Sequence, residues 1–414
     1  MIRVGVAVVE VAVPVGTPMA GYAARPGPSV GTHDPLTVRA LVVDGVGLVS
    51  VDCCALDERT CAVIRTSSGL REVFVAATHT HSGPSLTPGR VGGADEAVLA
   101  SVIDAAAKAL DAASRAAVPC GVRYGETTGA GVARNRRHLD RPIDPPLQVV
   151  SFDGDAGPVA VLVTYPCHPV VLDASNRLVS ADYPGVLRAA VEAAYPTAVC
   201  VFMTGCAGDV NDGHAAEASY TAVASPRRTF DDVARVGRLL GEAAVGALSA
   251  ASDVDTTSGL RVATVPVTLA LQPLRRADVI ADRDLWCSRT GSVPASERAV
   301  VDVWAAWADD WLAAPERPTT WESRVGRLLL GSLSVVTLPC EPFLGVAERL
   351  GSVLGPAVVL GYTDGVVGYL PTADDYPDGG YEVVDAHRYY GMPGPFRRGT
   401  AEQLVDAVVN LRPG

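Results

Sequence analysis

The 414-residue sequence has almost no lysine, no paired-cysteine motif and no long apolar run, and each absence excludes a class of protein. Lys108 is the only lysine, and 34 basic against 46 acidic residues give a net charge of −12. Nucleic acids and anionic membranes bind clustered positive charge, so we expect neither as a partner. No apolar stretch of about 20 residues is uninterrupted enough to span a bilayer.

The cysteines do not form a disulfide framework. There are nine, an odd number, without CxxC spacing, and several lie within apolar runs such as AVCVFM. The first residues, MIRVGVAVVEVAVPVG, begin directly with strand-like alternation and lack the features of a secretion signal. We therefore expect a reduced, cytoplasmic protein whose thiols pack as small hydrophobic side chains.

Hydrophobic residues are abundant, at 48% of the chain, and their spacing is typical of strands and helices. Asp-Gly pairs at 44–45 and 153–154 predict hairpins over residues 37–52 and 147–165, because tight hairpin turns require positive φ. Helical periodicity marks five segments, at 95–117, 229–250, 295–313, 342–354 and 399–411. The regular repeat of a TIM barrel is missing. We expect a mixed α/β (α+β) fold in one large domain over residues 1–414.

All five tryptophans lie within residues 272–325, which we interpret as a helical insertion in this domain. Trp304, Trp307 and Trp311 are spaced i, i+3 and i+7 and therefore share one helix face. That face either docks on the core or forms an aromatic wall of a substrate pocket or subunit interface. The sequence therefore leaves open whether the protein forms a homo-oligomer.

Two of the seven histidines end one apolar strand, because residues 72–81 read EVFVAATHTH. Side chains at i and i+2 of a strand share a face, so His79 and His81 should point into the same space. This is the spacing of metal ligands, although two histidines hydrogen-bonded in a loop would look the same. Four others are interpreted as structural or loop residues: His33, His138, His214 and His387.

Other strands end in polar residues of the same kind. Strand 159–165 leads to His168, and the strand in LGSLSVVTLP leads to Glu341, which either joins a site or caps the helix that follows. Tyr369 ends the segment VVLGYTDGVVGY. Ligand sites lie at the carboxyl ends of strands in open sheets, so one shared site is the economical interpretation. Imidazoles, a carboxylate and a phenolate suit Zn²⁺.

Seven motifs follow the order and spacing of the neutral ceramidase family, which the chain resembles over nearly its whole length. They are THTHSGP (78–84), NRR (135–137), CHPV (167–170), SADYPG (180–185), GCAGDVN (205–211), LPCEPF (338–343) and GYLPT…GGYE (368–382). The resemblance implies a neutral-ceramidase-like catalytic domain with mixed sheets and surrounding helices. It implies zinc ligands at His79, His168, Glu341 and Tyr369. It also implies that His81, Arg136 and Tyr381 belong to the catalytic centre.

Two departures separate the sequence from that family. Ceramidases have a serine directly after GDV, where this chain has Asn211, and asparagine cannot form an acyl-enzyme. The chain ends at Gly414, about where the ceramidase catalytic domain ends, so we expect no C-terminal immunoglobulin-like domain. With the missing signal, these features argue against a secreted enzyme acting on membrane sphingolipid.

Zinc lowers the pKa of bound water to about 7, so a nucleophile is available without a serine. We expect a zinc-dependent hydrolase that cleaves the amide bond of a small soluble N-acyl compound. Tyr381, with His81, would stabilise the oxyanion or move protons. Asn211 would orient water or substrate, and Asp209 would hold a histidine or shape a turn. Arg136 would bind a substrate carboxylate or hydroxyl, unless it lies on a solvated surface.

Other interpretations compete with this one. Ester or lactone hydrolysis and acyl transfer would use the same zinc site. A catalytically inert relative that binds a ligand is favoured by Asn211. A metallo-β-lactamase would need aspartate where Gly83 stands, and an amidohydrolase barrel often needs a carboxylated lysine, whereas Lys108 lies in an Ala-rich segment.

Overall fold

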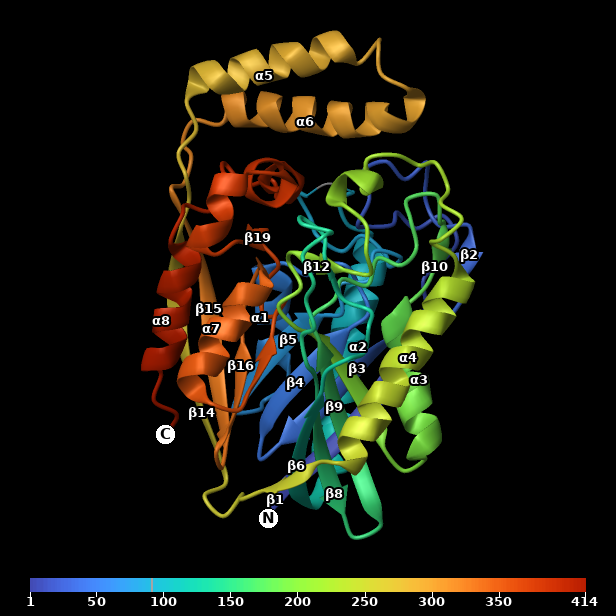
Figure 1. The fold of residues 1–414 in the computed structure, drawn as a ribbon, viewed down its shortest axis with the longest axis vertical. Helices are drawn as coiled ribbons and strands as arrows, with labels where there is room; N and C mark the ends of the chain where they lie inside the picture. The colour runs from blue at the N-terminus through green and yellow to red at the C-terminus, as the bar shows by residue number, and fades with distance from the viewer. Residues whose placement is uncertain (91) are drawn as a thin grey trace.

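Two β-sheets lie face to face and share one apolar core between them (Figure 1). The computed structural model describes residues 1–90 and 92–414. The larger sheet contains β1 (Ile2–Val11), β3 (Leu36–Val43), β4 (Val46–Val51), β5 (Glu72–Ala77), β6 (Val118–Thr127), β8 (Leu147–Gly154), β9 (Gly157–Tyr165), β11 (Val199–Thr204) and β13 (Ser252–Val254). Its order is β11-β9-β8-β6-β1-β3-β4-β5, with β13 also paired to β6. Strand β6 joins the halves, since residues 118–120 pair with β1 and residues 121–127 pair with β8.

The smaller sheet has the order β14-β15-β16-β18. Its strands are β14 (Leu260–Ala270), β15 (Thr320–Leu330), β16 (Leu333–Thr337) and β18 (Ala357–Leu360). Leu328 and Val335 of this sheet pack in the same core as Phe74 and Phe152 of the larger one. Burial on both faces explains why strands such as β5 read as continuous apolar runs.

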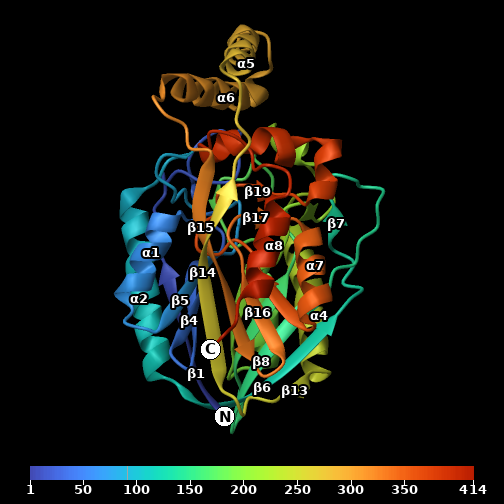
Figure 2. The same ribbon diagram turned by 90° about the vertical axis from the view of Figure 1, so that its left-hand side faces the viewer.

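Helices cover the outer face of each sheet (Figures 1 and 2). The larger sheet carries α1 (Glu58–Ser67), α2 (Glu96–Arg115), α3 (Tyr183–Ala194) and α4 (Phe230–Ser249), and the smaller one carries α7 (Leu344–Leu354) and α8 (Thr400–Asn410). Alternation along β5 shows how the layers form. Val73 and Val75 join the core with α1 and α2, whereas Phe74 and Ala76 face the other sheet.

Between β14 and β15 the chain leaves the layers as a helical hairpin, at the top of Figure 1. It consists of α5 (Arg276–Arg289) and α6 (Ala295–Ala313). The indole Nε1 of Trp307 donates to the carbonyl of Met392 at 2.9 Å, and that of Trp311 donates to Pro393 at 2.7 Å. These tryptophans therefore dock α6 onto the chain below it, as one of the two interpretations of the tryptophan face predicts.

The predicted mixed α/β fold is confirmed. All five predicted helices are present, with bounds that differ by at most two residues. The hairpin β3–β4 turns at Asp44-Gly45 as predicted, but β8–β9 turns at Asp155-Ala156, so the Asp153-Gly154 position was wrong. Asp153 and Gly154 instead pair with Pro158 and Gly157. Helices α1 and α3 were missed, and α5 lies within the predicted helical insertion. No helix in the described residues is both long and apolar enough to cross a bilayer.

Short ladders and turns connect the loops at one end of the sheets. The ladders are β2 (Gly31–Thr32) with β10 (Leu178–Val179), β7 (Arg134–Asn135) with β12 (Val210–Asn211), and β17 (Glu341–Pro342) with β19 (Tyr369–Leu370). The helical turns are η1 (Ala216–Ser219), η2 (Ala373–Asp378), η3 (Tyr381–Asp385) and η4 (Ala386–Tyr390). Every site residue predicted from the sequence lies in these segments or in the loops they tie together.

Asp182 begins α3 in a buried position where its carboxylate accepts from the backbone N–H of Tyr183 at 2.7 Å and of Leu172 at 3.3 Å. Burial, with the charges of Asp212 and Asp34, raises its pKa to about 7. The folded protein therefore binds a proton that the unfolded chain releases above pH 4, and the free energy of unfolding falls as pH rises from 4 to 7.

We expect Asp182→Asn to remove this pH dependence. Asparagine keeps the acceptor and tolerates the positive φ of 57°. Denaturant unfolding should show the variant gaining a few kcal/mol over the parent between pH 4 and pH 8, since one pKa unit is worth about 1.4 kcal/mol. Asp232→Asn is the control. A hydrogen bond from Thr229 lowers the pKa of Asp232, so the stability difference between this variant and the parent should change with pH in the opposite direction. A stability difference between Asp182→Asn and the parent that does not change with pH would contradict the raised pKa of Asp182.

Candidate metal centre and active site

Three side chains from distant parts of the sequence converge at the carboxyl ends of strands. His79 follows β5, His168 follows β9, and Glu341 follows β16. The Glu341 Oε2 atom lies 2.9 Å from His168 Nε2 and 3.2 Å from His79 Nε2. All three residues are buried, and one ligand atom from each lies within 4.8 Å of the others. The arrangement is that of a metal-binding cluster.

Backbone carbonyls orient both imidazoles. His79 Nδ1 donates to the carbonyl of Cys54 at 2.6 Å. His168 Nδ1 donates to the carbonyl of Ala207 at 2.6 Å and lies 3.1 Å from that of Val210. Because Nδ1 of each ring donates to a carbonyl, Nε2 is the nitrogen directed at the cluster in both histidines. This is how metal-binding histidines are held in proteins.

The charges in the cluster favour a cation. Burial lowers the pKa of His79, but the adjacent Glu341 carboxylate outweighs it and raises the pKa to about 10. Burial acts to raise the pKa of Glu341, but His79 and His168 hold it well below its usual range. Tyr390 donates its hydroxyl proton to Glu341 Oε1, which leaves Oε2 for the imidazoles. Two imidazoles and one ionised carboxylate therefore fit a divalent transition metal, which would displace the His79 proton.

Tyr369 lies beside the cluster, opposite Glu341 in the β17–β19 ladder. Its ring is stacked 6.2 Å from the His168 ring, and the Arg136 guanidinium lies 5.1 Å from its centroid. A second tyrosine, which the sequence did not reveal, also lies beside the cluster. The Tyr362 ring lies 4.4 Å from that of His79, and its buried hydroxyl has no hydrogen-bond partner in the described part of the chain.

His81 lies next to His79, with 3.2 Å between their Nε2 atoms. Burial, together with the adjacent His79 imidazolium, lowers its pKa well below the usual value, so its imidazole is neutral. The loop of residues 16–28 packs over it. Tyr22 meets its ring edge-on at 4.9 Å, Arg25 donates to its carbonyl, and Gly21 leaves no room for a side chain, since a Cβ there would lie 2.5 Å from His81 Cγ.

Arg136 is buried, with 6% of its surface exposed, so the solvated-surface interpretation was wrong. Its Nε donates to Glu382 Oε1 at 2.7 Å, while Nη2 is buried without a hydrogen-bond partner among the described residues. Arg137 binds the other oxygen of Glu382 at 3.1 Å. Tyr381 lies close by, its ring 5.6 Å from that of Tyr369.

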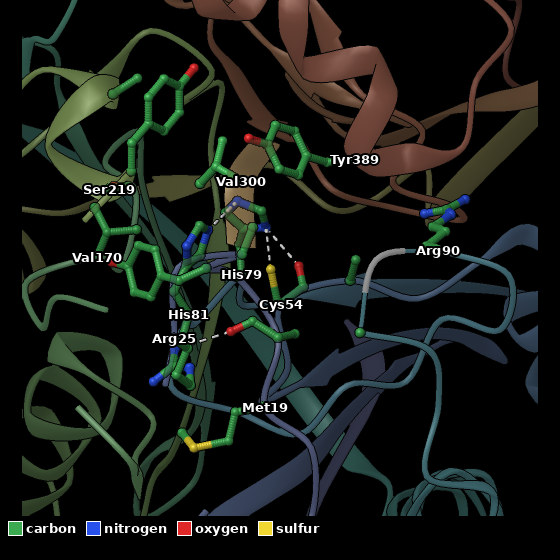
Figure 3. Close-up of a pocket in the computed structure, with 18 of the residues that line it drawn as sticks. Met19, Arg25, Cys54, His79, His81, Arg90, Val170, Ser219, Val300 and Tyr389 are labelled. Atoms are coloured by element: carbon green, nitrogen blue, oxygen red, sulfur yellow. Dashed lines mark hydrogen bonds between the residues drawn. The ribbon is translucent and has the colours of Figure 1, made fainter. Parts of the chain in front are cut away.

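The cluster opens into a cavity of about 490 Å³ (Figure 3). It is lined by His79, His81, Arg136, Asn211, Tyr369 and Tyr381, whereas His168, Glu341 and Asp209 are not among its lining residues. Figure 3 shows His79, His81 and Cys54 together, with Met19 and Arg25 below them and Tyr389 above. Val300 of α6 also lines the cavity, so the helical hairpin contributes to its wall.

Comparisons with known proteins show what the chain resembles in sequence and in fold. No family model matches the sequence. The neutral ceramidase of Mycobacterium tuberculosis is 24% identical over 381 residues, covering 75% of this chain and 60% of that protein. The neutral ceramidase of Pseudomonas aeruginosa is 30% identical over 131 residues, covering 27% of this chain and 20% of that protein. The crystal structure of neutral ceramidase from Pseudomonas aeruginosa superposes on 99% of this chain with a TM-score of 0.75.

The chain is similar to neutral ceramidases in sequence and in fold. The superposition has 19% sequence identity and covers 73% of that ceramidase chain. A structure described as ceramidase complexed with C2 gives a TM-score of 0.74 at 18% identity, covering 99% of this chain and 74% of that one. The predicted resemblance is thereby confirmed, and this neutral ceramidase-like chain spans 60% of the length of the Mycobacterium tuberculosis relative.

Asn211 and Asp209 of this neutral ceramidase-like chain have local structural partners. The Asn211 amide accepts from the backbone N–H of Gly213 at 2.8 Å and donates to the carbonyl of His214 at 2.8 Å. Asp209 Oδ1 accepts from the N–H of Leu344 at 2.8 Å, so Asp209, and not Glu341, binds the N-terminus of α7. No hydrogen bond joins Asp209 to a histidine among the described residues; its loop instead supplies the carbonyls that hold His168.

Proposed function

We propose that this protein is a zinc-dependent hydrolase that cleaves the amide bond of a small N-acyl compound. The observation that carries the proposal is the buried convergence of His79, His168 and Glu341 at a cavity large enough for a small molecule. The similarity to proteins named neutral ceramidase supports an amide as the bond that is cleaved.

His79, His168 and Glu341 would hold the zinc, with Tyr369 as the fourth ligand. Bound zinc would supply a Lewis acid and lower the pKa of a water molecule to about 7. The protein's part is to keep the ligands in the correct protonation state, through the carbonyls of Cys54 and Ala207 and through the hydroxyl of Tyr390.

Three other residues would bind and polarise the amide. The free Nη2 of Arg136 is available to a carbonyl or carboxylate oxygen of the substrate. Burial raises the pKa of Tyr381 well above its ordinary value, so its hydroxyl stays protonated and can donate to the developing oxyanion. His81 is neutral and can accept a proton from water or substrate. Asn211 would act indirectly, through the turn that it closes.

The cavity supports a small substrate with an apolar part. Met19, Val170 and Val300 line it together with several tyrosines, and its volume is about 490 Å³. Nine free cysteines, eight of them buried, support a reducing compartment, so we propose a cytoplasmic location and a soluble substrate. Esters and lactones present the same kind of electrophile, and ester hydrolysis or acyl transfer at this site remains the alternative.

The test combines metal removal with a substrate panel. We expect the purified protein to contain one zinc per chain by plasma mass spectrometry. Chelation should abolish, and added zinc restore, the hydrolysis of N-acyl p-nitroanilides. Protein without stoichiometric zinc would overturn the proposal. Zinc-loaded protein that cleaves neither amides nor p-nitrophenyl esters would favour the inert, ligand-binding relative.

A further inference from the structure

We propose that His214, with Asp212 beside it, is the residue that delivers a proton to the leaving amine of the substrate. The inference rests on the proposed amide hydrolysis and names a residue for one step of it. His214 lines the same cavity as His79, His81 and Arg136. The sequence alone suggested only a loop residue here.

The turn that presents His214 is closed by the side chain of Asn211. The amide oxygen accepts from the N–H groups of Gly213 and His214, at 2.8 and 3.1 Å, and the amide nitrogen donates to the His214 carbonyl at 2.8 Å. Asn211 is itself held in the β12–β7 ladder opposite Arg134. A serine, which ceramidases have at this position, has no carboxamide and could not make the same set of bonds. Asn211 is therefore suited to holding the turn that presents His214.

Asp212 lies beside the imidazole in an arrangement suited to proton transfer. Its Oδ1 atom is 3.1 Å from His214 Nδ1, and the two side chains are 13% and 16% exposed. The two atoms are within ion-pair distance, but Oδ1 makes no hydrogen bond among the described residues, His214 included. A carboxylate this close to Nδ1 stabilises the imidazolium when it forms, which leaves Nε2 as the atom that exchanges protons.

The surrounding charges keep the resting imidazole neutral. Burial lowers the pKa of His214, and the positive charges of Arg228 and Arg136 add to this, while Asp212 opposes it. A neutral ring with a carboxylate partner can accept a proton and then release it, which is the requirement for a shuttle.

The other histidines of the site are less able to act on the leaving group. Nδ1 of His79 and His168 is committed to backbone carbonyls, and their Nε2 atoms face Glu341. His81 lies against His79, in the group that encloses the cluster. His214 comes from a different loop, so it can approach the substrate from another part of the cavity wall.

The step balances without any added co-reactant. Water oxygen forms a bond to the carbonyl carbon, and His81 takes up one water proton. This proton passes through solvent to His214 Nε2, and His214 donates it to the amide nitrogen as the C–N bond breaks. The second water proton ionises from the new carboxylic acid and is taken up by the amine. The products are a carboxylate and an ammonium ion, and His214 ends neutral.

The chain supplies matched controls, because two further His–Asp pairs lie outside the cavity lining. His138 Nε2 is 3.2 Å from Asp378 Oδ2, and His33 Nδ1 is 2.9 Å from Asp34 Oδ2. His33 also stacks on Phe230 at 3.7 Å, which gives it a structural role. His138→Gln is therefore the control for His214→Gln, and Asp378→Asn the control for Asp212→Asn.

The test is the dependence of kcat/KM on the leaving group in the zinc-loaded protein. The probes are N-butylacetamide, whose amine cannot leave unprotonated, and p-nitrophenyl acetate, whose phenolate can. We expect His214→Gln to lower kcat/KM for the amide by about 10²-fold or more and for the ester by less than about threefold. Asp212→Asn should act in the same direction more weakly. The controls, zinc content and thermal midpoint should match the parent.

Two outcomes would overturn the inference while leaving the hydrolase intact: parental amide hydrolysis by His214→Gln, or equal losses on the amide and the ester. Equal losses would mean that His214 only shapes the cavity. A parent protein that cleaves neither probe nor any other acyl substrate would remove the proposed function and this inference together. Should His214→Gln unfold, the same comparison is made with Asp212→Asn, where equal losses on both probes again count against proton delivery.

Discussion

Replacing Glu341 with glutamine is expected to remove the bound zinc and to lower amide hydrolysis by at least about a thousandfold, equivalent to about 4 kcal/mol of transition-state stabilisation. Glutamine keeps the size of the side chain and the acceptor for Tyr390, but it loses the negative charge that lies 2.9 and 3.2 Å from the two imidazoles. Without that charge a cation in this buried position has no counter-ion.

The measurement is zinc content by plasma mass spectrometry beside kcat/KM on the amide panel, with folding checked by circular dichroism. Glu348→Gln is the control, because Glu348 is an exposed carboxylate on α7, seven residues along the chain. Stoichiometric zinc and parental activity in Glu341→Gln would show that the cluster is not the catalytic centre. Loss of zinc from His168→Gln with Glu341 intact would confirm that the three donors act as one site.

Exchanging Arg136 for lysine is expected to lower kcat/KM by about 10²- to 10³-fold while zinc stays bound. A planar guanidinium can bind Glu382 through Nε, stack on Tyr369 and still present Nη2 to the cavity. The lysine ammonium keeps the positive charge but not this geometry. The loss should therefore fall on transition-state binding and not on the metal.

Arg137→Lys is the matched control for this substitution. Arg137 binds the same carboxylate, Glu382, at 3.1 Å, but it does not line the cavity. We expect both variants to lose a similar amount of stability, measured by chemical denaturation, and only Arg136→Lys to lose activity. Equal activity losses would show that Arg136 acts by holding Glu382 and η3 in place.

A site shared by several strand ends was predicted from the sequence, and the structure brings His79, His168 and Glu341 together; their role as metal ligands stays a prediction. The prediction that His79 and His81 lie on one face of a strand was wrong. Strand β5 ends at Ala77, and His79 has a φ of 68°, so His79 and His81 do not share a strand face. A left-handed turn brings their rings together instead, and neither apolar periodicity nor residue spacing shows such a turn.

Several residues around the cluster gave no signal in the sequence. Tyr390 reaches Glu341, the Cys54 carbonyl holds His79, and Gly21 packs against His81. Each acts through a hydroxyl, a backbone carbonyl or a missing side chain, features that many residues share. Only their positions in the folded chain distinguish them. The same holds for His214, whose place in the cavity wall depends on the turn closed by Asn211.

The sequence by itself determined the mixed α/β composition, the five helices with clear apolar periodicity, the strand ends that carry histidine and glutamate, and the resemblance to neutral ceramidases. These properties depend on local spacing and on which residues are buried. Tertiary structure alone decided which nitrogen of each imidazole faces the cluster, that Arg136 is buried and that Asp209 binds a helix. Such features depend on contacts between residues that lie 25 to 246 positions apart in the chain, where a fraction of an ångström decides whether a hydrogen bond forms.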